Sequence, residues 1–278
     1  MRLATLAASL LAAAQLISPA SADTKTVLRE MTTLNDTRGW EGVGRLNLGG
    51  SGFCTGALIA PDLVLTAAHC LFDKTTGERI DGTTIEFLAG WRNGRAEAYR
   101  SVRRAATHPD YNYAETDAVG RVAADLALLE LDKPIRNNRV LPFAIAAQPR
   151  QGKAVGVVSY AQERSEAPSI QEACEVLERH GGVAMLNCDV NYGSSGAPVF
   201  AIIGGQPHIV SVVSAKAAVE GRKVALSSEL QRSLHQLKMA LADVESGILN
   251  RGLASGGTFT NGDRKSSLGA KFIRPNSN

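Results

Sequence analysis

Residues 191–200 read NYGSSGAPVF, in which two adjacent serines, Ser194 and Ser195, stand between two glycines. Glycines and a nearby proline bend a chain sharply and bring backbone N–H groups close together. Such a turn can be an ordinary surface loop, or it can present a serine as a nucleophile. The choice depends on whether the chain also supplies the other groups that serine chemistry needs.

Candidates for those groups lie upstream of the turn. Serine hydrolysis needs a base for the hydroxyl proton, a carboxylate that orients the base, and N–H donors for the oxyanion. Of the five histidines, only His69 lies in a dense apolar frame, VLTAAHC. Asp125 opens the apolar run of ADLALLEL, where an unpartnered carboxylate would be costly to bury. Taken singly, His69 could be a structural histidine and Asp125 a turn residue.

The rest of the chain predicts an all-β protein. Short apolar runs such as GFCTGALIA, TIEFLAGW, AVGVVSY and HIVSVVS recur between Gly, Pro, Asn and Asp, as expected for sandwiches or barrels. Residues 132–152 contain three prolines and indicate a linker between two halves. A helix is expected near the end, with Ser228 as its N-cap, because leucines and other apolar residues recur on one helical face. These are Leu230, Leu234, Leu237, Leu241, Val244 and Ile248.

Three motifs together resemble a known family. LTAAHC, ADLALLEL and GSSGAP, in that order, are similar to the active-site motifs of the trypsin-like serine peptidases, and the resemblance covers roughly residues 42–226. It implies two packed six-stranded antiparallel barrels with the site between them. It also implies His69 as general base, Asp125 as the carboxylate that orients it, and Ser195 as nucleophile, since the family pattern is G-x-S-G-x-P. The backbone N–H groups of Gly193 and Ser195 match the oxyanion hole.

The sequence departs from the digestive enzymes of that family at Ser194. Those enzymes have an aspartate there, which pairs with an amino terminus released by cleavage. Ser194 carries no charge, and no R-[IV]-V-G-G segment precedes Val43. We therefore expect the oxyanion hole to form without an amino-terminal ion pair.

The substrate pocket is less well defined by the sequence. By offset, Asp189 matches the aspartate of a pocket for basic side chains, but it could equally cap a turn. Ser214 resembles the serine that lines the substrate strand. Lys216 could neutralise Asp189, narrow the pocket, attract acidic side chains or point to solvent. The histidine that glutamyl enzymes often carry on this strand is replaced by Val213.

Four cysteines, Cys54, Cys70, Cys174 and Cys188, allow three disulfide pairings. The simplest joins near neighbours, Cys54 with Cys70 and Cys174 with Cys188. The first pair is similar to the disulfide that clamps the histidine loop in the family, and the second belongs to an expected hairpin. The position of Cys188, seven residues before Ser195, resembles the secreted bacterial branch related to glutamyl endopeptidases. The four cysteines are not spaced like the ligands of a metal site.

The N-terminal segment suggests export. Residues 1–22 have an early arginine, an apolar run and an A-x-A site, as in a signal peptide that is removed, so no stable membrane insertion is expected. The peptidase halves are expected at residues 23–138 and 139–228. The helix follows at 229–249, and a mobile tail at 250–278, where only residues 271–274 are expected to dock.

The sequence thus predicts a secreted or periplasmic serine endopeptidase that works through an acyl-enzyme. We expect a monomer with protein or peptide substrates and with no metal or organic cofactor. The net charge of +3 is too small to indicate a nucleic-acid partner. The alternative is a non-catalytic binding protein on the same scaffold, since fold alone does not fix function.

Overall fold

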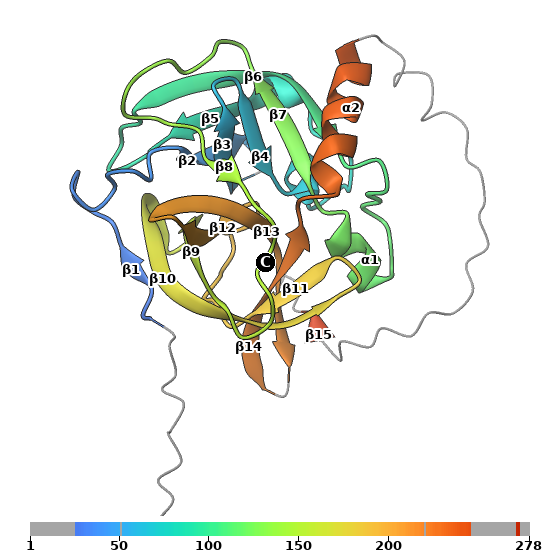
Figure 1. Ribbon diagram of the computed structural model, residues 1–278. Helices are drawn as coiled ribbons and strands as arrows, with labels where there is room; N and C mark the ends of the chain where they lie inside the picture. Colours follow the sequence, from blue (N-terminus) through green and yellow to red (C-terminus); the bar gives the residue numbers. More distant parts are fainter. Residues whose placement is uncertain (1–25, 51, 220, 246–270, 273–278) are drawn as a thin grey trace, which may run out of the picture.

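The computed structural model describes residues 26–245 apart from 51 and 220, together with residues 271–272 (Figure 1). The strands form two barrels, one above the other in this view, and a long helix lies beside the upper one. The signal peptide expected at residues 1–22 lies outside the described residues, as does all of the expected tail except residues 271–272. No helix in the described ranges combines the length and the apolar character that crossing a membrane requires.

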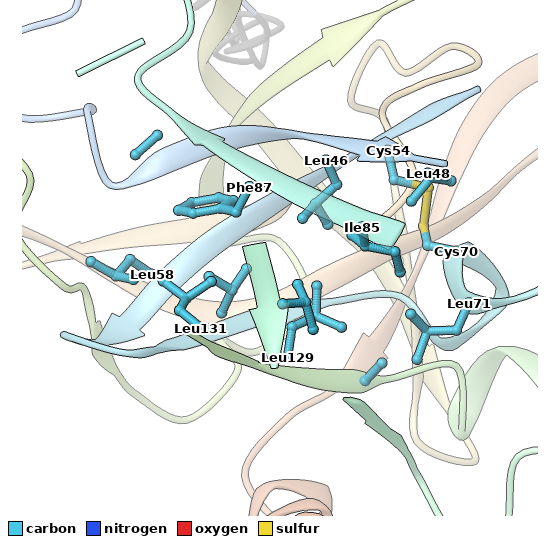
Figure 2. Packing of buried hydrophobic residues seen from close by; sticks show 14 of the residues in the cluster. Leu46, Leu48, Cys54, Leu58, Cys70, Leu71, Ile85, Phe87, Leu129 and Leu131 are labelled. Atoms are coloured by element: carbon cyan, nitrogen blue, oxygen red, sulfur yellow. A yellow bond between two sulfur atoms is a disulfide. The ribbon is translucent and has the colours of Figure 1, made fainter. Parts of the chain in front are cut away.

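The first barrel consists of six antiparallel strands paired in the closed order β2-β3-β4-β7-β6-β5. Alternating side chains along each strand point inward, where Leu46, Leu58, Phe87 and Leu129 are fully buried (Figure 2). The strands are β2 (Val43–Leu48), β3 (Phe53–Ala60), β4 (Leu63–Thr66), β5 (Ile85–Ala89), β6 (Ala98–Thr107) and β7 (Ala127–Leu131).

The second barrel also closes. Its strands pair in the order β10-β11-β14-β13-β12-β9, and β9 pairs back to β10. They are β9 (Ala154–Ala161), β10 (Arg164–His180), β11 (Val183–Leu186), β12 (Pro198–Ile203), β13 (Gln206–Val219) and β14 (Arg222–Glu229). Three two-residue strands add to its edges, namely β1 (Arg29–Glu30), β8 (Ala144–Ile145) and β15 (Lys271–Phe272). The predicted all-β architecture of two six-stranded barrels is therefore confirmed.

Both disulfides join near neighbours, as predicted. Cys54 at the start of β3 is bonded to Cys70 in the short 3₁₀ helix η1 (Ala68–Leu71). Cys174, inside β10, is bonded to Cys188, which follows β11, and the turn residues Gly181 and Gly182 between the two strands both have positive φ.

Two α-helices complete the described fold, α1 (Ala118–Ala123) and α2 (Ser233–Glu245), with a second 3₁₀ turn η2 (Gly82–Thr84). The α2 helix packs on β6 and β7 through buried Leu237 and Leu241. The expected N-cap at Ser228 is wrong. Ser228 lies in β14, paired with Val183 and Val212, and its hydroxyl donates to the Val122 carbonyl. Strand pairing thus outweighs the local capping preference, and the helix begins after β14.

Candidate active site

His69 lies in η1, immediately after β4 and at the junction of the two barrels. The apolar LVLT sequence buries β4, and the Cys54–Cys70 disulfide ties η1 to β3. The two cysteine sulfurs lie close to the His69 ring, but they are bonded to each other and supply no thiolate for a metal ion. The His69 side chain is 20% exposed, and its ring Nδ1 faces Asp125.

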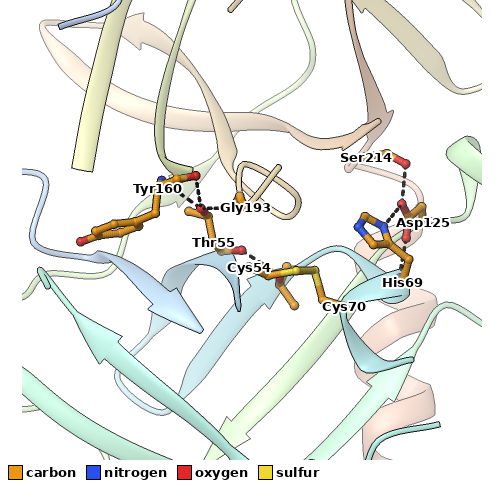
Figure 3. Close-up of a disulfide and its surroundings, with 9 residues drawn as sticks. Cys54, Thr55, His69, Cys70, Asp125, Tyr160, Gly193 and Ser214 are labelled. Atoms are coloured by element: carbon orange, nitrogen blue, oxygen red, sulfur yellow. Dashed lines mark hydrogen bonds and ion pairs between the residues drawn. A yellow bond between two sulfur atoms is a disulfide. The ribbon is translucent and has the colours of Figure 1, made fainter. Parts of the chain in front are cut away.

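Asp125 lies between α1 and β7 and is almost completely buried, with a side-chain exposure of 4%. Its carboxylate accepts two hydrogen bonds from His69, from the backbone N–H at 2.8 Å and from ring Nδ1 at 2.7 Å. A third comes from the Ser214 hydroxyl on β13 (Figure 3). The three donors replace the water that this carboxylate loses on burial.

This arrangement fixes the orientation of the imidazole. An ionised carboxylate only accepts hydrogen bonds, so the Nδ1 atom that faces it carries a proton and Nε2 is left as an acceptor. The Asp125 charge also reaches Tyr111. The pKa of the Tyr111 phenol is raised above its usual value. Burial of the phenol is the larger cause, and the nearby Asp125 carboxylate is the second.

The turn that carries Ser195 depends on two glycines. Gly193 has a φ of +95°, and a Cβ there would lie 2.4 Å from the Phe53 ring. Gly196 has a φ of +79°, and a Cβ would lie 2.1 Å from Thr66 Oγ1 and 3.0 Å from the Ala67 nitrogen. Only glycine accommodates both the backbone conformation and these contacts. Gly196 therefore packs directly on the residues that lead into His69.

Thr55, which the sequence interpretation did not identify, holds this turn in place. Its side chain is fully buried and donates to the Gly193 carbonyl at 2.8 Å, while its hydroxyl accepts from the Tyr160 N–H (Figure 3). The backbone N–H of Thr55 donates to the Ser195 carbonyl at 2.8 Å. Its position directly after Cys54, in the motif FCTG, was the only signal available in the sequence.

The two serines occupy different environments. Ser194 is fully buried, and its hydroxyl lies within hydrogen-bond distance of Ser159 Oγ and the Tyr160 carbonyl, at 3.2 and 3.3 Å. Ser195 is partly exposed. Over the described ranges, no hydrogen bond joins the Ser195 hydroxyl to His69, and neither the Gly193 nor the Ser195 N–H donates within the protein.

The residues expected in the substrate pocket have partners of different kinds. Ser214 donates to Asp125, as described above. The Asp189 N–H donates to Gln171 Oε1 at 2.7 Å. Burial lowers the pKa of the Arg164 guanidinium, and nearby carboxylates, that of Asp189 among them, oppose this shift.

Lys216 reaches from β13 to the loop that precedes Ser195. Its ammonium donates to Asn191 Oδ1 at 2.8 Å and lies 4.0 Å from the centroid of the Tyr192 ring. Both contacts favour a fixed position for the charge, since a cation is attracted to the face of an aromatic ring. The Lys216 side chain therefore does not point freely to solvent.

The chain is similar to several known proteins. Residues 50–206 match the trypsin-like peptidase domain. The chain is 26% identical over 150 residues to a glutamyl endopeptidase of Bacillus licheniformis, which covers 54% of this chain and 45% of that protein. It is 33% identical over 95 residues to guinea pig (Cavia porcellus) coagulation factor IX, which covers 34% of this chain and 30% of the relative. The chain thus spans less than half the length of these curated relatives.

Among solved structures, the fold is similar to that of a Glu endopeptidase in complex with MPD, with a TM-score of 0.63. The superposition covers 77% of this chain and 97% of the other, at 19% sequence identity. At that identity the likeness concerns the fold, and the chemistry must be argued from the residues.

Proposed function

Because the chain belongs to the trypsin-like peptidase family, we propose that it is an exported serine endopeptidase that hydrolyses peptide bonds with His69, Asp125 and Ser195. The observation that carries the proposal is the buried Asp125 carboxylate, which accepts from both the backbone and the ring of His69. A charge buried in this way is costly unless hydrogen-bond donors compensate it, and two of the three donors here belong to His69. These two bonds hold the imidazole in one orientation, as a base for Ser195 requires.

The proposed reaction has two halves. Ser195 Oγ attacks the substrate carbonyl carbon while His69 Nε2 takes the hydroxyl proton, and the carbonyl oxygen becomes an oxyanion. The Gly193 and Ser195 N–H groups, which have no partner within the described protein, would donate to that oxyanion. Collapse breaks the C–N bond as His69 returns the proton to the leaving amine. Water then attacks the acyl-enzyme with His69 again as base, and this step releases the acid and restores Ser195.

Export is the other part of the proposal. The two disulfides favour an oxidising compartment, where such bonds persist. Together with the signal-peptide pattern of residues 1–22, they support a periplasmic or extracellular enzyme.

A fluorophosphonate probe tests the activity directly. The native chain is expected to become labelled at Ser195, as shown by peptide mass spectrometry, and denatured chain should not react. A folded chain that stays unlabelled would instead favour the binding-protein alternative. Labelling of Ser194 would show that the nucleophile has been assigned wrongly.

For the substrate side chain, we propose an acidic residue on the amino side of the scissile bond, read by Lys216. The ammonium is held at the loop before Ser195, and the similarity to a glutamyl endopeptidase points in the same direction. With Glu, Arg, Ala and Phe ester substrates, the Glu ester should have the highest kcat/KM.

Lys216→Ala should lower kcat/KM for the Glu ester about tenfold or more, since charge-assisted hydrogen bonds are the strong ones. The Ala ester should change little. Lys223→Ala, which removes an exposed lysine of neighbouring β14, is the matched control. A preference for Arg in the native chain would instead assign the specificity to Asp189.

A further inference from the structure

The edge of β13 that faces Ser195 has an unusual set of partners. On one edge, β14 pairs with β13 from Ser211 to Val219. On the opposite edge, β12 pairs with β13 up to Val212, and a further bond joins Gly196 to Val213. Beyond this point β12 turns away into the loop that carries Ser195. Among the described residues, nothing pairs with residues 214–216 on this edge.

The same edge is occupied again just beyond that gap. The two-residue strand β15 pairs antiparallel with β13, Phe272 opposite Ala217 and Lys271 opposite Ala218. Ala217 and Ala218 also pair with Val224 and Lys223 of β14, so β15 must lie on the other edge, the one that β12 has left. In Figure 1, β15 lies away from α2, next to the strands of the lower barrel, although it follows α2 in the sequence.

An open strand edge beside a nucleophile is a site for an extended peptide, which adds to the sheet through its backbone. Because paired strands advance residue for residue, the gap of residues 214–216 has room for about three peptide residues next to Ser195. A longer substrate would continue along the edge to Ala217 and Ala218, where β15 already lies. Substrate and β15 cannot use the same backbone groups at once.

The geometry points to the C-terminal segment of this chain as an intramolecular competitor for extended substrates, an inference that rests on the proposed peptidase function. Lys271 and Phe272 occupy the part of the β13 edge that lies beyond Lys216. Phe272, opposite Ala217, is the residue of β15 that lies nearest to the gap. A tethered segment acts at an effective concentration on the order of millimolar, so even a short strand competes well.

The test compares two peptide substrates that share one scissile bond. One has three residues on the amino side of that bond, and the other has six. Deletion of residues 271–278 should lower the KM of the six-residue substrate at least about fivefold, the size of effect that loss of a tethered competitor gives. KM for the three-residue substrate and kcat for both should stay within about twofold, because only the outer edge is released.

A full-length variant guards against effects of truncation on folding. Lys271→Pro with Phe272→Pro should reproduce the deletion, since proline cannot donate to a strand ladder. Ser266→Pro, which precedes the paired residues in the sequence, is the matched control and should behave as the native chain. An unchanged KM for the longer substrate, or an equal change for both substrates, would overturn the inference.

A second readout does not depend on catalysis. In a chain with Ser195→Ala, backbone amides of residues 214–219 should exchange with deuterium faster once residues 271–278 are deleted. If exchange rises but no variant hydrolyses peptides, the pairing stands and the peptidase proposal fails. If peptides are hydrolysed but exchange does not change, the inference about the C-terminal segment fails instead.

Discussion

Ser195→Ala is expected to lower kcat on the order of 10⁶-fold, the loss that accompanies removal of a triad nucleophile. The Ser195 side chain is partly exposed, and its turn is fixed next to the His69 segment by the packing of Gly196 on Thr66 and Ala67. Peptide hydrolysis under substrate saturation measures the loss. The residual rate should come from the oxyanion donors and substrate binding, which the substitution leaves in place.

Ser194→Ala is the matched control for this substitution. The Ser194 hydroxyl is buried against Ser159 Oγ and the Tyr160 carbonyl, so its loss removes structural hydrogen bonding worth about 1 kcal/mol. A small decrease in melting temperature and a change in kcat of less than about tenfold are expected. If Ser194→Ala abolished activity while Ser195→Ala retained it, the nucleophile would be Ser194.

The contrast between these serines shows what the sequence could and could not predict. The pattern G-x-S-G-x-P selected Ser195, and the structure adds that Ser194 is turned into the protein. Where digestive enzymes have an aspartate that pairs with an amino terminus, this chain has a neutral hydroxyl bonded to β9. The expectation that the oxyanion hole forms without an ion pair remains a prediction, because the described residues begin at 26.

Motifs of short range were predictable because each is encoded by a few adjacent residues. Short apolar runs between turn residues predicted an all-β chain, and the resemblance of three motifs implied the two barrels. Both disulfides join cysteines that are close in sequence. Contacts between distant segments were not accessible in this way. The hydrogen bond from Thr55 to Gly193 spans 138 residues. The hydrogen bond from Lys216 to Asn191 joins a strand to a loop, and no periodic pattern in the sequence indicates that the two residues meet.

The start of the C-terminal helix shows that a local sequence signal can also mislead. A serine before an apolar periodic run is a sound N-cap signal, yet Ser228 extends β14 and bonds to α1. The α1 helix itself has a local signal that the sequence interpretation overlooked, since the Asp117 side chain caps the N–H groups of Val119 and Gly120.

Asp125→Asn is expected to lower kcat about 10⁴-fold while leaving the fold intact. Asparagine has nearly the same shape as aspartate, but one of its oxygens becomes an NH₂ group that donates. If that group faces His69 Nδ1, the ring must accept there and carry its proton on Nε2, where it can no longer take the proton of Ser195. The fluorophosphonate labelling rate should fall together with kcat, because both reactions need the base.

Ser214→Ala tests how much one hydrogen bond to the Asp125 carboxylate contributes when its charge and its bonds to His69 are kept. It removes one of three donors to the carboxylate and leaves both bonds from His69, so a loss of about tenfold or less is expected. If the Asp125→Asn variant melts at a temperature close to that of the native chain, its loss of activity comes from the imidazole and not from a folding defect. If Asp125→Asn kept more than about a tenth of the native kcat, a role for Asp125 in orienting His69 would be excluded, since a misoriented base cannot sustain triad catalysis.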